Sequence, residues 1–299
     1  MYGLLALLDL QEVGTATIAV SGAADASSDS AERGMRVFVG PSQRTPQERV
    51  FGGQVLAQCV IAAGRTVADI APTRRIHSLH GYFIRPGDDK QPIRFAVEEL
   101  RDGNSFSTRR VHALQHGHVI LSMTTSFQEP ASGLDHQDPM PSVPAPEDLP
   151  PWEPDETDAH ARWRRRRLVE LRHVEGDLFR DRVSPESASQ HVWMRTIARL
   201  PDDPLIHAAV LAFASDYTLL EGALRRHGLG WTDPRLRVAS LDHAMWFHRP
   251  GRADEWLLYA EHSPSAQGGR GLGRGRMYTR DGLLVASVAQ EGMVRVKGE

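Results

Sequence analysis

The sequence predicts an α+β fold made of two similar modules, each a long helix wrapped by an antiparallel sheet. Three observations lead to this prediction. The phrases "GHVILSMTTSFQEP" and "GLLVASVAQEGM" both run from apolar to small residues and end near Gln-Glu, with Gln128 and Gln290 162 positions apart. A proline-rich segment separates them. Stretches with apolar residues at helical spacing and stretches with alternating apolar and polar residues also recur in the same order on either side of that segment.

Two further pairs of phrases recur at similar spacing. "GYFIRPGD" matches "MWFHRPGR", with Pro86 lying 42 residues before Gln128 and Pro250 lying 40 residues before Gln290. Upstream, "VFGGQVLAQCVIAAGRTV" faces "AFASDYTLLEGALRRHG". Matching spacing at three places favours an internal duplication over chance.

The elements of each half follow from periodicity and turn residues. In the first half we expect a strand at 35–41, a helix at 52–70 and strands at 76–86, 91–102, 105–117 and 118–128. In the second we expect strands at 167–174, 191–200, 236–250, 254–264, 271–281 and 283–296. A single helix is expected over 203–228, with Asp203 as N-cap, Pro204 at the first helical position and Gly228 as C-cap.

Four segments follow from these assignments. Residues 1–34 should form a short amphipathic helix that docks on the body, followed by a flexible polar loop over 19–34. The first module is expected over 35–128 and the second over 165–299. Between them, 129–164 is acidic and holds eight prolines within 129–160, which indicates a linker.

Composition excludes several functional classes. The formal net charge of −3 gives no basic field for nucleic acid. One cysteine, Cys59, excludes an internal disulfide and indicates a reducing compartment. No apolar stretch approaches the ~20 residues of a membrane span, and the apolar start lacks the basic residues of a secretory signal. We therefore expect a cytoplasmic protein.

Six phrases resemble the acyl-CoA thioesterase II family: "FGGQVLAQ", "SLHGYFIRPGD", "LPDDPLIHAAVLAFASDY", "SLDHAMWFHRP", "DEWLLY" and "DGLLVASVAQEG". The resemblance covers roughly 35–128 and 165–296. The resemblance implies a double hotdog fold, two helix-in-sheet halves side by side. It implies hydrolysis of acyl-CoA to free acid and coenzyme A, with no metal or cofactor. It also implies an active site in which an Asp, a Ser or Thr and a Gln hold a water.

Carried over to this chain, these residues are Asp216 in "FASDYTLL", Ser240 in "RVASLDHAMWF", where many relatives have Thr, and Gln290 in "VASVAQEG". A carboxylate can accept a proton from water, and a hydroxyl and an amide can orient that water. A developing oxyanion needs donors such as the N–H groups of a first helical turn. Asp216 lies inside the expected helix, so a break near 214–217 is required. The glycines of "FGG" (51–53) would let another segment approach the backbone closely.

The duplication tests this assignment. With the Arg-Pro-Gly phrases aligned, Asp216 falls opposite Gly53 and Ser240 opposite Ile76, while Gln290 keeps Gln128 as its counterpart. The first half thus has one of the three polar groups. We infer one active site per chain, in the second module.

Other interpretations stay open. An acyl-CoA hydratase would want an Asp–His pair near a helix start, and "ASDY" has no such His. A non-catalytic acyl-CoA binding protein would keep the fold without turnover. His243 is expected to pack against Trp246, and Asp242 to be structural or to support Ser240. "RWRRRRL" (162–168) is best interpreted as a solvated charge run and "GGRGLGRGR" (268–276) as a strand region, although their arginines could meet coenzyme A. Exposed sheet edges suggest a homo-oligomer, a dimer or tetramer.

Overall fold

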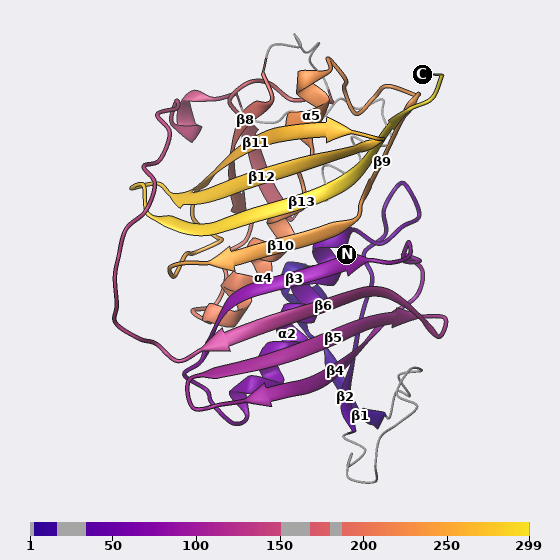
Figure 1. The fold of residues 1–299 in the computed structure, drawn as a ribbon, viewed down its shortest axis with the longest axis vertical. Coiled ribbons are helices and arrows are strands. Elements are labelled where there is room, and N and C mark those ends of the chain that lie inside the picture. The colour runs from indigo at the N-terminus through magenta and orange to yellow at the C-terminus, as the bar shows by residue number, and fades with distance from the viewer. Residues whose placement is uncertain (1–2, 17–33, 151–167, 180–186, 299) are drawn as a thin grey trace.

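A computed structural model describes residues 3–16, 34–150, 168–179 and 187–298. Every strand in these ranges belongs to one antiparallel sheet, ordered β1-β2-β4-β5-β6-β3-β10-β13-β12-β11-β8-β7, with β9 paired to β13 off this path. Figure 1 shows the first-half strands below, the second-half strands above, and helices α2 and α4 behind the middle of the sheet.

The two halves share one strand order. The first contains β2 (Met35–Gly40), α2 (Gly52–Ala68), β3 (Arg75–Phe83), β4 (Ile93–Asp102), β5 (Phe106–Gln115) and β6 (His118–Gln128). The second contains β8 (Ser189–Thr196), α4 (Pro204–Ser215), α5 (Glu221–Arg226), β9 (Leu236–Ser240), β10 (Asp242–Phe247), β11 (Leu257–Gln267), β12 (Arg270–Thr279) and β13 (Leu284–Val296). The first half runs β2-β4-β5-β6-β3 and the second β8-β11-β12-β13-β10, so the same positions are occupied in the same sequence.

The halves join through the antiparallel pair of β3 and β10. Ala244 lies opposite His80, and these residues are 164 positions apart, as are Pro86 and Pro250. Equivalent residues of the two copies therefore face each other, which is the register that a local two-fold axis between the strands produces.

The core lies between the sheet and the helices. Helix α2 buries apolar side chains around most of its circumference, Leu56 and Val60 among them, because it is covered by the sheet on one side and by α4 on the other. Gly64 allows that approach, since a Cβ there would lie 2.3 Å from Leu205 Cδ1. One apolar cluster consequently extends over both halves.

The single helix predicted over 203–228 is wrong in one respect. Helix α4 begins as predicted, with Asp203 accepting a hydrogen bond from Leu205 N at 2.8 Å. It ends at Ser215, however, and a turn over 216–220 separates it from α5. Gly228, the predicted C-cap, has φ of +63° and lies one residue beyond His227, the C-cap of α5. Similarly, the strand predicted over 236–250 is interrupted at Leu241, between β9 and β10.

The N-terminal segment docks on the body as predicted. Helix α1 (Leu4–Leu8) buries Leu7 completely and contacts α2. The edge strand β1 (Gln11–Ala16), which pairs with β2, was not anticipated. The strand predicted over 167–174 is present as β7 (Val169–His173), which pairs with β8 at the opposite edge of the sheet. Most of the 19–34 loop lies outside the described residues.

The described part of the predicted linker, residues 129–150, has a single short 3₁₀ turn, η1 (Pro146–Asp148). It follows the side of the second half in Figure 1. Apolar residues of this stretch pack on the outer apolar cluster of that half, and Gln137 bonds both Gly282 O (2.7 Å) and Leu284 N (3.0 Å). Acidic residues pair with Arg276 and Arg280. The stretch is therefore also a packing element.

None of the helices in the described part of the chain has the length and apolarity that a membrane span requires.

Candidate active site

Asp216 lies at the point where α4 ends, as its C-terminal cap with φ of −91° and ψ of 1°. The required break in the second-half helix is therefore present. Asp216 retains some accessible surface, although protein atoms crowd around its carboxyl group.

The three predicted residues come together. Gln290 Nε2 donates to Asp216 Oδ1 at 2.6 Å, and Ser240 Oγ donates to the same oxygen at 3.2 Å. The pairing of β9 with β13 places these side chains close together. Ser240 pairs with Gly292, two residues beyond Gln290, so the side chains of Ser240 and Gln290 both lie on the face of the sheet that carries the helices.

A fourth group was missed by sequence reasoning. Gly53 N, in the first turn of α2, donates to Asp216 Oδ2 at 2.8 Å. The site therefore spans both halves, and the positive end of α2 faces the carboxylate. The only sequence signal was the "FGG" phrase. A Cβ at Gly52 would lie 2.6 Å from Asp216 Oδ2, and one at Gly53 would lie 2.3 Å from Phe213 O, so this approach requires glycine.

The contact also corrects the alignment of the two copies. Helices α2 and α4 begin at Gly52 and Pro204, 152 positions apart, which places Asp216 opposite Gly64 rather than Gly53. The second half adds the 216–220 turn and a longer connection before its next strand, so one constant offset cannot align both helices and strands. Under this alignment the Gly64–Leu205 contact is the two-fold mate of the Gly53–Asp216 contact.

The electrostatic environment makes Asp216 an unusually basic carboxylate. Burial raises the pKa of Asp216 to about 6, while the hydrogen bonds from Gln290, Ser240 and Gly53 N act to lower that pKa. The group is thus largely ionised at neutral pH. Beside it, Phe51 contacts Phe213 and Tyr217, with ring centroids 5.3 and 4.7 Å apart, which gives the site an apolar wall.

Of the two polar residues near Ser240, His243 departs from its predicted place and Asp242 takes one of its two predicted roles. His243 is buried, and its Nε2 lies 2.9 Å from Ser215 Oγ instead of packing against Trp246, which points to the other face and contacts His80. Burial lowers the pKa of His243 to about 3, so its ring is neutral. Asp242 Oδ1 accepts from Glu291 N at 2.7 Å, which is a structural role.

Two remaining motifs are not part of the site. The arginine run over 162–168 lies almost entirely outside the described residues. The glycine-rich phrase forms β12 and the turn before it, as expected for a strand region. Over the described ranges, no three His, Cys, Asp or Glu side chains lie together as metal ligands do.

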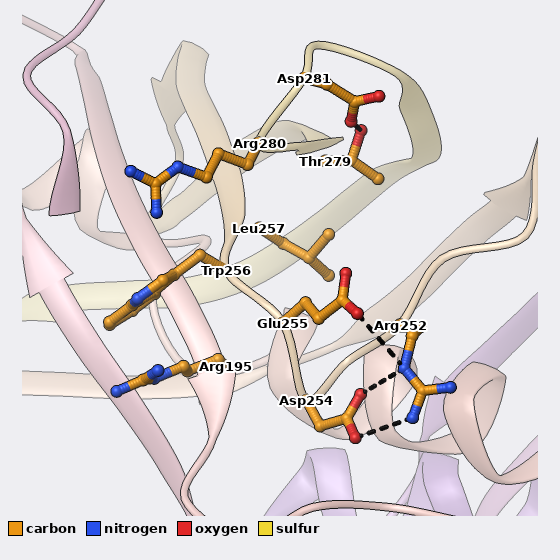
Figure 2. A pocket seen from close by; sticks show the side chains of 9 residues that line it. All are labelled: Arg195, Arg252, Asp254, Glu255, Trp256, Leu257, Thr279, Arg280 and Asp281. Carbon is orange, nitrogen blue, oxygen red and sulfur yellow. Dashed lines mark hydrogen bonds and ion pairs between the residues drawn. The ribbon is translucent and has the colours of Figure 1, made fainter. Parts of the chain in front are cut away.

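A hollow of about 350 Å³ lies elsewhere in the second half (Figure 2). The arginines that line it are all paired: Arg252 binds Asp254 (2.9 Å) and Glu255 (3.5 Å), while Arg195 and Arg280 pair with acidic residues outside the hollow. Asp254 also accepts from Leu200 N, just before α4, whereas Asp216 ends that 12-residue helix, about 18 Å away. This hollow is therefore separate from the candidate active site.

Comparisons with known proteins cover most of the chain. The family model described as acyl-CoA thioesterase matches residues 170–293, and the acyl-CoA thioesterase N-terminal domain matches 41–128. Acyl-CoA thioesterase 2 of Haemophilus influenzae is 38% identical over 276 residues, covering 87% of this chain and 92% of that protein. Human acyl-coenzyme A thioesterase 8 is also 38% identical over 276 residues, covering 87% and 85%.

Solved structures show the same likeness. The acyl-CoA thioesterase II TesB2 of Mycobacterium marinum is 45% identical, with a TM-score of 0.72, and the match covers 88% of this chain and 94% of that one. A hot dog fold protein of unknown function from Alicyclobacillus acidocaldarius is 21% identical with a TM-score of 0.71, covering 90% and 95%, and supports the hotdog fold alone.

Proposed function

This chain belongs to the acyl-CoA thioesterase family, and we propose that it hydrolyses acyl-CoA thioesters to free carboxylic acids and coenzyme A. The observation that carries this proposal is the carboxylate of Asp216, hydrogen-bonded by Gln290 and Ser240 at the start of α2. We also propose a double hotdog fold, supported by the shared strand order of the two halves.

In the proposed reaction a water held by Asp216, Ser240 and Gln290 attacks the thioester carbonyl carbon. Asp216 accepts the proton of this water as the new C–O bond forms. The tetrahedral intermediate then expels the sulfur: the C–S bond breaks, its electron pair leaves with the thiolate, and the proton is returned to give coenzyme A and the acid. The raised pKa of Asp216 makes this carboxylate a better base than a solvated aspartate.

The developing oxyanion needs hydrogen-bond donors. The first turn of α2 supports this step, because N–H groups at a helix start lack intrahelical acceptors and carry the positive end of the helix dipole. Since α2 belongs to the first half and Asp216 to the second, both copies contribute to one site. Gly64 stands opposite Asp216 in the aligned helices, which supports one active site per chain.

We further propose that the protein acts in the cytoplasm, without a cofactor, as a homo-oligomer. The outermost strands β1 and β7 support the last point, because each leaves one edge of the sheet unpaired within the described residues. Light scattering would measure the oligomeric state.

The function is tested by thiol release from acyl-CoAs of short to long chain. We expect Asp216→Asn to lose at least ~10²-fold in kcat/KM while acyl-CoA binding is retained. Gln290→Ala should also lower kcat, whereas Gln128→Ala, the equivalent change in the first half, should leave it within about two-fold. Binding by the wild type without thiol release would indicate a binding protein, and hydration of an enoyl-CoA would indicate a hydratase.

A further inference from the structure

The turn that follows Asp216 is attached to a buried polar network that the proposed reaction does not use. Thr218, 2% exposed, donates from Oγ1 to Glu261 Oε1 at 2.6 Å. Gln190 Nε2 donates both to the other oxygen of Glu261 and, at 3.2 Å, to Thr218 O. The hydroxyl and the carbonyl of Thr218 are thus both fixed from outside the turn.

The network is anchored on several elements. Gln190 lies on β8 and Glu261 on β11, at registered positions of adjacent strands. Arg225, on α5, donates from Nε to Gln190 Oε1 at 2.5 Å and from Nη1 to Glu175 O at 3.0 Å. Burial raises the pKa of Glu261 to about 8, although its hydrogen bonds from Thr218 and Gln190 act to lower it. Burying such a carboxyl group is unfavourable by itself, so a role beyond packing is indicated.

The residue before Asp216 is fixed in the same way. Ser215 Oγ lies 2.9 Å from His243 Nε2, and Tyr259 Oη donates to Ser215 O at 3.2 Å. The turn is also seated closely on β12, because a Cβ at Gly273 would lie 2.3 Å from Leu219 O. The backbone on both sides of Asp216 is therefore held by groups from the sheet.

We propose that Thr218 is a positioning residue: held by Glu261, its hydroxyl fixes the turn that aims the Asp216 carboxylate at Gly53 N, Ser240 and Gln290. This inference rests on the proposed function of Asp216. The effect can be large, because displacing a reacting group by ~1 Å can slow a reaction by ~10²-fold. Without the Thr218–Glu261 bond, the turn keeps its other contacts but loses the side-chain bond that holds it on the C-terminal side of Asp216.

The test compares Thr218→Val with Thr218→Ser and with Thr66→Val. Valine keeps the shape of threonine and removes the hydroxyl, whereas serine keeps the hydroxyl. Thr66 is a matched control, because its hydroxyl is also bonded to a charged side chain: it is 1% exposed, its Oγ1 accepts from Arg109 Nε at 2.9 Å and donates to Ala63 O at 2.8 Å, and it lies near the far end of α2. Both valine variants should lose similar stability through a lost buried hydrogen bond.

We expect Thr218→Val to lower kcat by ~10-fold or more with KM within about two-fold, and Thr218→Ser to restore kcat to within about three-fold. Thr66→Val should leave kcat unchanged. Titration of the Asp216 carboxyl carbon by ¹³C NMR should show a displaced midpoint in Thr218→Val but not in Thr66→Val. This second readout needs no turnover, so it tests Thr218 even if the wild type releases no thiol and the proposed function fails.

Two results would overturn the inference. One is a Thr218→Val enzyme with wild-type kcat and an unmoved Asp216 titration. The other is a Thr218→Ser variant as impaired as Thr218→Val, which would show that the methyl group, not the hydroxyl, is needed.

Discussion

At the scale of single residues, burial and hydrogen bonding shift the pKa of Asp216 in opposite directions. Partial burial makes its carboxylate more basic, while three donors keep it ionised and oriented. A buried carboxyl group with a raised pKa reduces the stability of the folded protein when it is charged, which is a cost consistent with the role proposed for Asp216 as a base.

The first prediction concerns the pH dependence of the rate. Because the base must be ionised and the pKa of Asp216 is raised to about 6, kcat/KM should rise with pH and level off above about pH 7. Initial rates of thioester loss between about pH 5 and about pH 8 measure this. A flat profile across that range would contradict the assignment of Asp216 as the base.

The second prediction concerns stability. The folded pKa of Asp216 is raised above its ordinary 3.8, so its neutral form favours folding below about pH 4, and this contribution is lost as pH rises through about 6. Asp216→Asn cannot ionise. We therefore expect the free energy of unfolding of the variant, relative to wild type, to rise by on the order of 1–2 kcal/mol between about pH 4 and about pH 8. Urea unfolding at both pH values checks it; a difference that stays constant or falls would contradict it.

The sequence could predict which three side chains come together in the candidate site, but not all of their partners. Asp216, Ser240 and Gln290 lie in long phrases with a family pattern. Gly53 contributes a backbone N–H, which any residue except proline possesses, so no letter of the sequence marks it. Thr218 looked like one more helical residue, because its partner Glu261 lies 43 positions away.

At the scale of elements, the break between α4 and α5 positions the site. The sequence over 203–228 favours one helix, since Gly222 is its only glycine before Gly228 and it has no proline after Pro204. Contacts of Ser215 and Thr218 with the sheet outweigh this local preference. The strand order was predictable from alternating periods; the break was expected only because the chemistry required it.

The third prediction tests the approach of α2 to α4. Gly53→Ala should lower kcat by ~10²-fold, because its Cβ would lie 2.3 Å from Phe213 O and push the start of α2 away from Asp216. Gly64→Ala is the control: its Cβ would meet the side chain of Leu205, which can rotate. That variant should lose about 1–3 kcal/mol of stability with kcat unchanged. Equal kcat losses in both variants would contradict a specific role of Gly53.

At the scale of the whole molecule, the segment between the halves is asymmetric. Prolines and acidic residues predicted a linker, but its packing could not be predicted, because several of its partners, Gly282, Arg276 and Arg280, lie more than a hundred positions away in the sequence. It covers the outer face of the second half, where Trp193 donates to Pro144 O at 3.0 Å. The half that carries Asp216 is thus covered on both faces of its sheet.

The fourth prediction concerns the packing of residues 129–150 on the second half. Gln137→Ala removes hydrogen bonds to Gly282 O and Leu284 N and should lower the free energy of unfolding by about 1–2 kcal/mol, with kcat unchanged. Gln267→Ala, an exposed change at the end of β11, should have no effect on either quantity. A Gln137→Ala variant as stable as wild type would show that residues 129–150 do not brace the second half.

The register of β3 and β10 has a consequence for stoichiometry. A chain whose equivalent residues meet across one strand pair amounts to a homodimer whose two subunits have become a single polypeptide. Such a dimer would have two identical catalytic centres, each completed by the start of a helix from the other subunit. In this chain the position that the two-fold axis relates to Asp216 holds Gly64, and the side chain of Leu205 fills the space next to Gly64. A tight-binding substrate analogue should therefore saturate at one equivalent per polypeptide, however many polypeptides assemble.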